Sequence, residues 1–242
     1  MGPRMKTTIK KTSRIITIVI CEIITLCTIG SLFYVKKYSR SLLAFFTIFL
    51  IFLPEIFERL MRCSINNAVY ILTVLYLIGP MLGHCCKFYH RISWWDKALH
   101  TYGGVVFALL GIFLFEQLWR GNESRLLVAL FAICFSVCVS VIWEFYEFGA
   151  DMLFGNDMMD DVVISEFNSY LLGDSVGEIG SASGITAVEI NGSPLPVSGY
   201  IDIGLIDTMT DMLLETLGAI AVTLACCVPD KQLRFIEPKL SY

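Results

Sequence analysis

Three short segments of the chain carry ionisable side chains at helical spacing. The residues are Asp96 and His100, then Glu144 and Glu147, then Asp207 and Asp211. Members of each pair are three or four positions apart, and residues at that spacing lie on the same side of an α-helix. The sequence therefore predicts three helices, each with a polar stripe. Carboxylates and one imidazole are ligand types that suit a hard or borderline divalent cation.

The six residues suggest a catalytic metal site. His100, Glu144, Glu147 and Asp211 are the expected ligands of Mn, Fe, Mg or Zn. Asp96 would be a further ligand, or His100 would be a base that Asp96 orients, and one carboxylate would remain to activate water. Grouped carboxylates cannot all stay ionised without a cation or a proton. We therefore expect a metal-dependent hydrolase or transferase.

Two alternatives use the same residues. Carboxylates near helix N-termini are favoured by the helix dipole and cap free N–H groups, which would explain Asp96 and Asp207 without any reaction. The cluster would then only hold the helices of a structural or accessory protein together. A cation or proton-coupled transporter is the other alternative. The expected inner halves of the last three apolar runs offer few polar residues for its route.

The elements that must position these residues are membrane-spanning helices. Hydrophobic residues make up 56% of the 242 residues, charged residues 17%, and the mean hydropathy is +0.69. A soluble domain has about 25% charged residues. A span needs about 20 apolar residues, and six such runs are present: 15–35, 41–57, 67–85, 97–118, 125–150 and 207–228. The predicted fold is all-α, a polytopic transmembrane helical bundle whose partner is the lipid bilayer. Its composition argues against a nucleic-acid surface.

The charges between these runs predict an orientation. With the N-terminus inside, the inner segments hold twelve Lys and Arg and the outer segments hold six. Cytoplasmic segments carry the excess of positive charge, so we expect N-in and C-in, with cytoplasmic segments 1–14 and 229–242. All three polar stripes then fall at the outer face, where they can form one site.

The expected loop 151–206 is acidic and lies outside. It holds nine carboxylates and no Lys or Arg. Its second half alternates apolar with small or polar residues around Asn191-Gly192, a dipeptide typical of a two-residue hairpin turn. We therefore expect a small extracytoplasmic β-hairpin loop.

These motifs resemble a known family. Trp95-Asp96-Lys97 with His100, then Glu144-Phe145-Tyr146-Glu147, then Gly204 to Asp211 with Gly218-Ala219, look like the YjdF-type family of bacterial membrane proteins. The likeness covers roughly residues 67–225 and implies a multi-pass protein of the bacterial plasma membrane. A more distant likeness is to VanZ-like proteins. Neither resemblance implies a particular reaction, although a lipid or envelope component suits an outward-facing site. Residues 158–200 look like an insertion in the last outer loop.

Overall fold

The computed structural model describes residues 3–119, 124–227 and 236–238. The chain forms two compact units. The first unit comprises residues 1–139 and 214–242, and the second comprises residues 140–213. The boundaries fall inside helices α7 (Arg125–Phe154) and α8 (Leu205–Cys227), so each of these helices belongs partly to both units.

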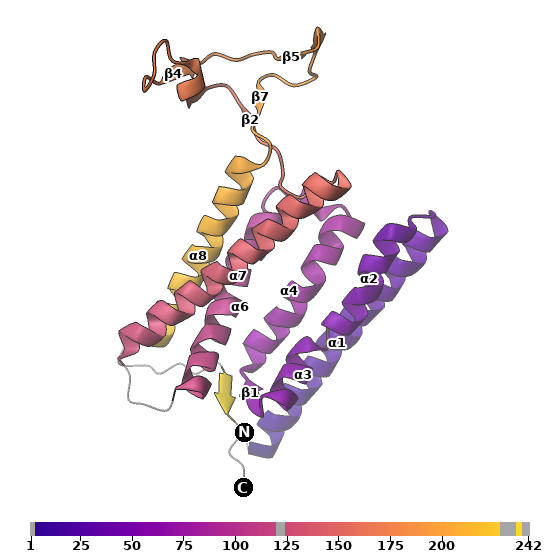
Figure 1. Ribbon diagram of the computed structural model, residues 1–242. Helices are drawn as coiled ribbons and strands as arrows, with labels where there is room; N and C mark the ends of the chain where they lie inside the picture. Colours follow the sequence, from indigo (N-terminus) through magenta and orange to yellow (C-terminus); the bar gives the residue numbers. More distant parts are fainter. Residues whose placement is uncertain (1–2, 120–123, 228–235, 239–242) are drawn as a thin grey trace. The chain divides into compact units, whose positions relative to one another are not determined.

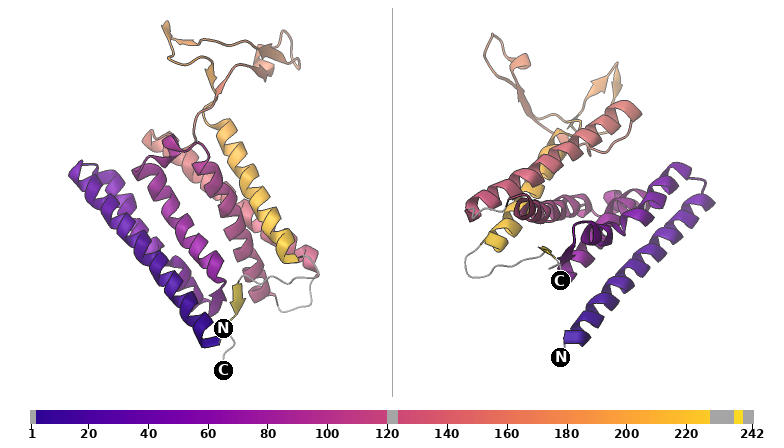
Figure 2. Two further views of the ribbon diagram at one scale, coloured as in Figure 1. Left: turned by 180° about the vertical axis from the view of Figure 1, so that it is seen from behind. Right: turned by 60° about the horizontal axis from the view of Figure 1, so that its bottom comes forward.

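The first unit is helical with one short strand pair. Its complete elements are α1 (Pro3–Tyr34), α2 (Tyr38–Leu50), α3 (Leu53–Leu60), β1 (Cys63–Ile65), α4 (Asn67–Cys85), α5 (Phe88–Arg91), α6 (Trp95–Leu118) and β8 (Ile236–Pro238). Figure 1 shows α1, α2 and α4 running side by side, and Figure 2 shows the same grouping from two other directions. Cys21, Ala44, Tyr70, Val74 and Met81 are among the buried residues of their shared core.

The outer faces of these helices are apolar and exposed. Ile23, Leu26, Phe45, Phe49 and Leu72 are examples. Exposed apolar surface on this scale is unsuited to water and suited to lipid, where helices satisfy their own backbone hydrogen bonds. Among the described residues, six helical stretches are long and apolar enough to cross a membrane: Lys11–Tyr34, Arg40–Leu60, Asn67–Cys85, Trp95–Leu118, Arg125–Phe154 and Leu205–Cys226. The predicted six-span helical fold is confirmed.

The ends of the helices differ from the expected runs. Helix α1 starts at Pro3, so most of the basic segment 1–14 is helical. The second run is broken between α2 and α3, where Pro54 occupies the first turn of α3 and lacks an N–H for a continuous helix. Of the expected C-terminal segment 229–242, residues 229–235 and 239–242 lie outside the described residues. Ile236–Pro238 forms β8, which pairs antiparallel with β1.

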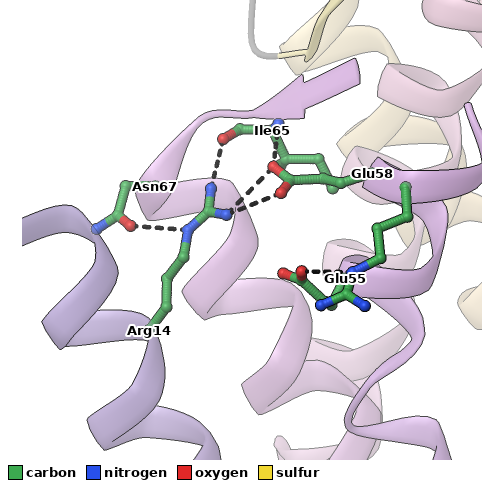
Figure 3. A network of polar contacts seen from close by, with 6 residues as sticks. Arg14, Glu55, Glu58, Ile65 and Asn67 are labelled. Atoms are coloured by element: carbon green, nitrogen blue, oxygen red, sulfur yellow. Dashed lines mark hydrogen bonds and ion pairs between the residues drawn. The ribbon is translucent and has the colours of Figure 1, made fainter. Parts of the chain in front are cut away.

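An ion pair joins the elements near β1, as Figure 3 shows. Arg14 of α1 donates to both carboxylate oxygens of Glu58 in α3, at 3.2 and 3.1 Å. It also donates to the Ile65 carbonyl oxygen at 2.6 Å and to Asn67 Oδ1 at 3.0 Å, and its guanidinium lies 3.9 Å from the centre of the Tyr70 ring. Both charged side chains are about nine-tenths buried. One arginine therefore links α1, α3, β1 and α4.

The second unit contains the end of α7, the start of α8 and the chain between them. Three short antiparallel pairs form there: β2 (Val163–Ile164) with β7 (Tyr200–Ile201), β3 (Phe167–Ser169) with β4 (Gly180–Ala182), and β5 (Glu189–Ile190) with β6 (Ser193–Pro194). A one-turn helix, η1 (Tyr170–Leu172), follows β3. Asn191 and Gly192 have φ values of 54° and 77° and connect β5 to β6. The predicted hairpin is confirmed, and it is one of three such pairs.

Candidate functional site

In the first unit, α6 and α8 pack with their backbones in contact. A Cβ atom at Gly104 would collide with the carbonyl oxygen of Glu215, and one at Gly218 would collide with the carbonyl oxygen of Thr101. Only glycine fits at both places. The small residues at 103–104 and 218–219 therefore serve close helix packing. This packing brings the side chains beside Gly104 toward α8.

His100, one turn before Gly104, has a carboxylate near each of its ring nitrogens. Nε2 lies 3.6 Å from Asp96 Oδ1, and Nδ1 lies 3.9 Å from Glu215 Oε2. The imidazole is only 8% exposed and Glu215 only 4%. Lys97 contacts the other oxygen of Asp96 at 3.2 Å. Ionisable side chains within membrane-spanning segments destabilise the fold, and they are therefore usually kept for a function. The imidazole between two carboxylates is such a case.

The local sequence explains why Asp96 and His100 stand at the start of α6. The helix begins at Trp95, whose indole Nε1 donates to the Gly79 carbonyl oxygen of α4 at 3.3 Å. Asp96 lies in the first turn, where the helix dipole favours an anion. His100 follows by four residues and so lies on the same face.

Helix α7 also meets α6 inside the first unit. Ser136 Oγ donates to the Gly104 carbonyl oxygen at 3.3 Å. A Cβ atom at Gly111 would lie 3.0 Å from the Cα of Ala132. Buried positions continue along α7 at Ser140, Glu144 and Glu147. Steps of four and three residues keep these positions on one face of the helix.

In the second unit, Glu144 and Glu147 are a pair of buried carboxylates. They are 5% and 7% exposed, and each offers an oxygen within 4.8 Å of the other's. The indole Nε1 of Trp143 donates to Glu147 Oε1 at 2.9 Å, which fixes the rotamer of that glutamate. Asp96 and His100 of the first unit are likewise within 4.8 Å of each other at their ligand atoms. The described residues thus include acid and histidine groups with the spacing of metal ligands.

Three aspartates of the second unit hold the chain between the helices. Asp151 accepts from the Met158 and Met159 N–H groups at 2.7 and 2.9 Å, and Asp207 accepts from the Asp160 N–H at 3.0 Å. Asp202 accepts from three more N–H groups, those of Val162, Gly204 and Ile206. Asp207 therefore binds a backbone N–H of the preceding loop, whereas the N–H groups at the start of α8 are accepted by Asp202.

Asp161, in the chain between the helices, has a shifted pKa. Partial desolvation raises the pKa of Asp161, and the neighbouring charge of Asp157 raises it further. The carboxylates of Asp202 and Asp151 act in the same direction. An acidic segment without Lys or Arg has no cation to reverse this effect.

The six predicted residues separate into groups by unit. Asp96 and His100 lie together in the first unit, while Glu144 and Glu147 lie together in the second. Asp211 is 1% exposed and lies on α8 one turn before Glu215. Glu215 was not among the ligands predicted from the sequence. Its position eight residues after Asp207 was the signal that could have included it.

Residues 16–231 match a protein family described as "Predicted membrane protein (DUF2238)". A protein of Thermotoga maritima, described as "Uncharacterized protein", is 26% identical over 103 residues. This match covers 42% of the chain and 54% of that protein, so the chain spans about half the length of this relative. No solved structure matches the chain.

Proposed function

The chain belongs to this family of predicted membrane proteins, and on that premise we propose that it is a metal-dependent membrane enzyme. Its class would be a hydrolase or transferase, and its substrate a lipid or another component of the cell envelope. The family description specifies no reaction, so the proposal rests on the chemistry of the site.

The observation that carries the proposal is the buried imidazole of His100 between Asp96 and Glu215. Two ligand atoms that each lie about 2.0–2.2 Å from one ion are roughly 3–4 Å apart. The separations at His100, 3.6 and 3.9 Å, are of this size. A ligating histidine usually gives its second nitrogen to a carboxylate that orients it. One flanking carboxylate would share the ion with His100, and the other would hold the ring.

The remaining ligands would come from the neighbouring turns of α7 and α8. Asp211 precedes Glu215 by one turn on the same face of α8. Glu147 follows Ser136 by eleven residues, close to three turns, and Ser136 contacts Gly104 of α6. We propose His100, Glu144, Glu147 and Asp211 as ligands, with Glu215 added to the expected set.

An ion held in this way would supply a nucleophile. A divalent ion lowers the pKa of bound water and polarises a carbonyl or phosphoryl oxygen. A carboxylate that does not bind the ion would accept the proton from that water. With Glu215 among the ligands, Asp96 would hold the His100 ring at Nε2, and the base would be another carboxylate of the proposed set that the ion leaves unbound. Mn, Fe, Mg and Zn remain the expected ions.

Metal content is the direct test. The protein would be purified in detergent and washed to remove weakly bound metal. Elemental mass spectrometry should then find a divalent ion that stays bound. His100→Ala should lose it. The matched control is His90→Ala, because His90 is exposed in α5 and outside the cluster. Equal metal content in the two variants would contradict the assignment of His100 as a ligand.

Chelation should reveal the same ion through stability. A ligand that binds only the folded state stabilises it by about 2.7 kcal/mol at a hundredfold excess over Kd. Removing the ion should therefore lower Tm, and more so at pH 8 than at pH 5, where protons can replace it on the carboxylates. The double variant Glu144→Gln with Asp211→Asn should show a smaller fall in Tm on chelation, because it removes two ligands and also the repulsion between their negative charges. A Tm indifferent to chelator at both pH values would favour a structural network.

The structural alternative is supported by a specific observation, namely that Asp151, Asp202 and Asp207 accept backbone N–H groups. Transport of a cation or proton is the third proposal, and ion uptake into vesicles containing the protein would identify it. The YjdF-type and VanZ-like affiliations, the bacterial plasma membrane and the N-in, C-in orientation stay predictions from the sequence.

A further inference from the structure

The first unit contains an apolar pocket beside the His100 site. Its volume is about 220 Å³, and its walls come from α3, α4, α6, β1 and β8. Phe57, Leu77, Phe107, Leu110 and Ile236 are among the lining residues. An apolar cavity of about 150 Å³ is enough to bind benzene. The pocket therefore has room for part of a hydrocarbon chain.

The surroundings of the pocket identify the source of that chain. Helices α3, α4 and α6 belong to three of the candidate spans, so hydrocarbon is the solvent around them. The two side-chain hydroxyls among the lining residues are those of Thr73 and Tyr76. Thr73 donates to the Val69 carbonyl oxygen at 2.8 Å, so its hydrogen is already used. A pocket with so few polar groups favours a chain from the bilayer over water.

Tyr76 connects the pocket to the polar site. Its ring lines the pocket, and its hydroxyl lies 3.1 Å from the position that a Cβ at Gly103 would occupy. The carboxyl carbon of Glu215 lies 3.9 Å from that same position, and Glu215 in turn faces His100. Gly103 has no side chain to separate them. The pocket and the His100 site therefore meet at Gly103, inside one unit of the protein.

We propose that this pocket holds an acyl chain of a bilayer glycerophospholipid whose headgroup lies at the His100–Glu215 site. The headgroup assignment rests on the proposed function, whereas the chain site stands on the pocket. Tyr76 would lie where chain and headgroup join, and its hydroxyl can donate to an ester oxygen there. The substrate would then be a diacyl lipid, recognised by its chain and processed at its polar end.

Photolabelling tests the chain site. The full-length protein would be placed in phosphatidylethanolamine and phosphatidylglycerol vesicles that contain a phosphatidylethanolamine with a diazirine midway along one acyl chain. After irradiation, peptide mass spectrometry should find label on Phe107 and Leu110. Label confined to lipid-facing residues such as Leu75 would overturn the proposal.

A filled pocket supplies the matched comparison. Leu77→Trp should block the pocket and abolish the label on Phe107 and Leu110. Leu75→Trp, two positions away on α4 but 45% exposed, should leave that label unchanged. If Leu77→Trp does not fold, a second probe replaces it. A diazirine beside the ester should move the wild-type label toward Tyr76 and Gly103, and an identical labelling pattern for both probes would overturn the assignment.

Metal analysis of the same samples separates this inference from the proposed function. Metal bound through His100 without label in the pocket would refute the chain site and leave the metal enzyme standing. Label in the pocket with metal content indifferent to His100→Ala would refute the metal site and with it the headgroup assignment. A prenyl phosphate carrying a diazirine, added in parallel, should label the pocket weakly. Stronger labelling by this isoprenoid would overturn the choice of an acyl chain.

Discussion

Arg14 shows how much a single side chain can contribute to this fold. It donates to Glu58, to the Ile65 carbonyl and to Asn67, and the Ile65 N–H donates back to Glu58 at 2.6 Å. The hydropathy pattern could not predict this arrangement, since Arg14 belongs to a basic segment expected to face the cytoplasm. The pairing depends on a three-residue strand and a broken second span, and neither has a strong signal in the sequence.

Removal of the Arg14 guanidinium should strongly destabilise the protein. Arg14→Met would leave Glu58 buried without its cation, and breaking a buried pair in this way costs about 3–5 kcal/mol. Arg14→Met with Glu58→Met should cost less, because no charge is then left buried. Thermal unfolding in detergent would measure both changes.

The exposed ion pair between Arg59 and Glu55 is the control for that experiment. Its side chains are 77% and 37% exposed. Arg59→Met should change the free energy of unfolding by no more than about 1 kcal/mol. Equal losses of stability in Arg14→Met and Arg59→Met would show that the Arg14–Glu58 pair in Figure 3 does not stabilise the fold.

The carboxyl group of Asp161 should make the acidic segment sensitive to pH. Because desolvation and Asp157 raise its pKa, the folded segment binds this proton more tightly than the unfolded chain does. The contribution to stability is complete below the ordinary aspartate pKa and is lost as pH rises through the raised value. Asp161→Asn should therefore increase protection of the Val162 N–H at neutral pH and change it little in acid. Hydrogen exchange, corrected for intrinsic rates at each pH, would measure this, and Asp174→Asn in the same loop should have no effect.

At the scale of elements, the sequence predicted the helices well and their partners less well. The apolar runs predicted six spans, and Asn191-Gly192 predicted a hairpin. The close contact between α6 and α8 became evident only in the structure. The sequence could not separate a structural role of Asp207 from a catalytic one, because a carboxylate that accepts backbone N–H groups and a metal ligand can share the same spacing. The sequence could not identify Glu215 as a neighbour of His100, because their contact depends on the packing of α6 against α8.

That packing predicts a sharp difference between two glycines. Gly104→Ala would place a methyl group against the backbone of Glu215, where neither helix can yield without moving apart. Overpacking of this kind costs about 1–3 kcal/mol, and the Tm in detergent should fall accordingly. Metal content should fall with it if His100 and Glu215 bind the same ion.

Gly149 in α7 is the matched control. A Cβ atom there would meet nothing within 4 Å. Alanine is favoured over glycine inside a helix by roughly 0.5–1 kcal/mol. Gly149→Ala should therefore leave the Tm unchanged or raise it. A similar loss of stability in both variants would mean that α6 and α8 do not depend on contact at Gly104.

At the scale of the whole molecule, the orientation can be tested with reporter fusions. Fusions after Arg62 and Arg125 should report cytoplasm, because inner segments carry the excess of Lys and Arg. A reporter inserted at Asn191 should report the outside. A cytoplasmic signal at Asn191 would reverse the orientation, and the site would then face the cytoplasm.

The strand pair β2–β7 has a practical consequence. It brings Ile164 next to Tyr200 in the ladder, and Asp202 ties the same place to Val162. Because β2 pairs with β7, the two ends of the segment 165–199 lie next to each other. The length of that segment can therefore change without changing the distance between its ends. The β2–β7 pair is therefore a suitable place to insert another domain. Residues 165–199 can be exchanged for a compact domain of similar end-to-end span, which would give a multi-pass protein a rigid handle for imaging or affinity capture.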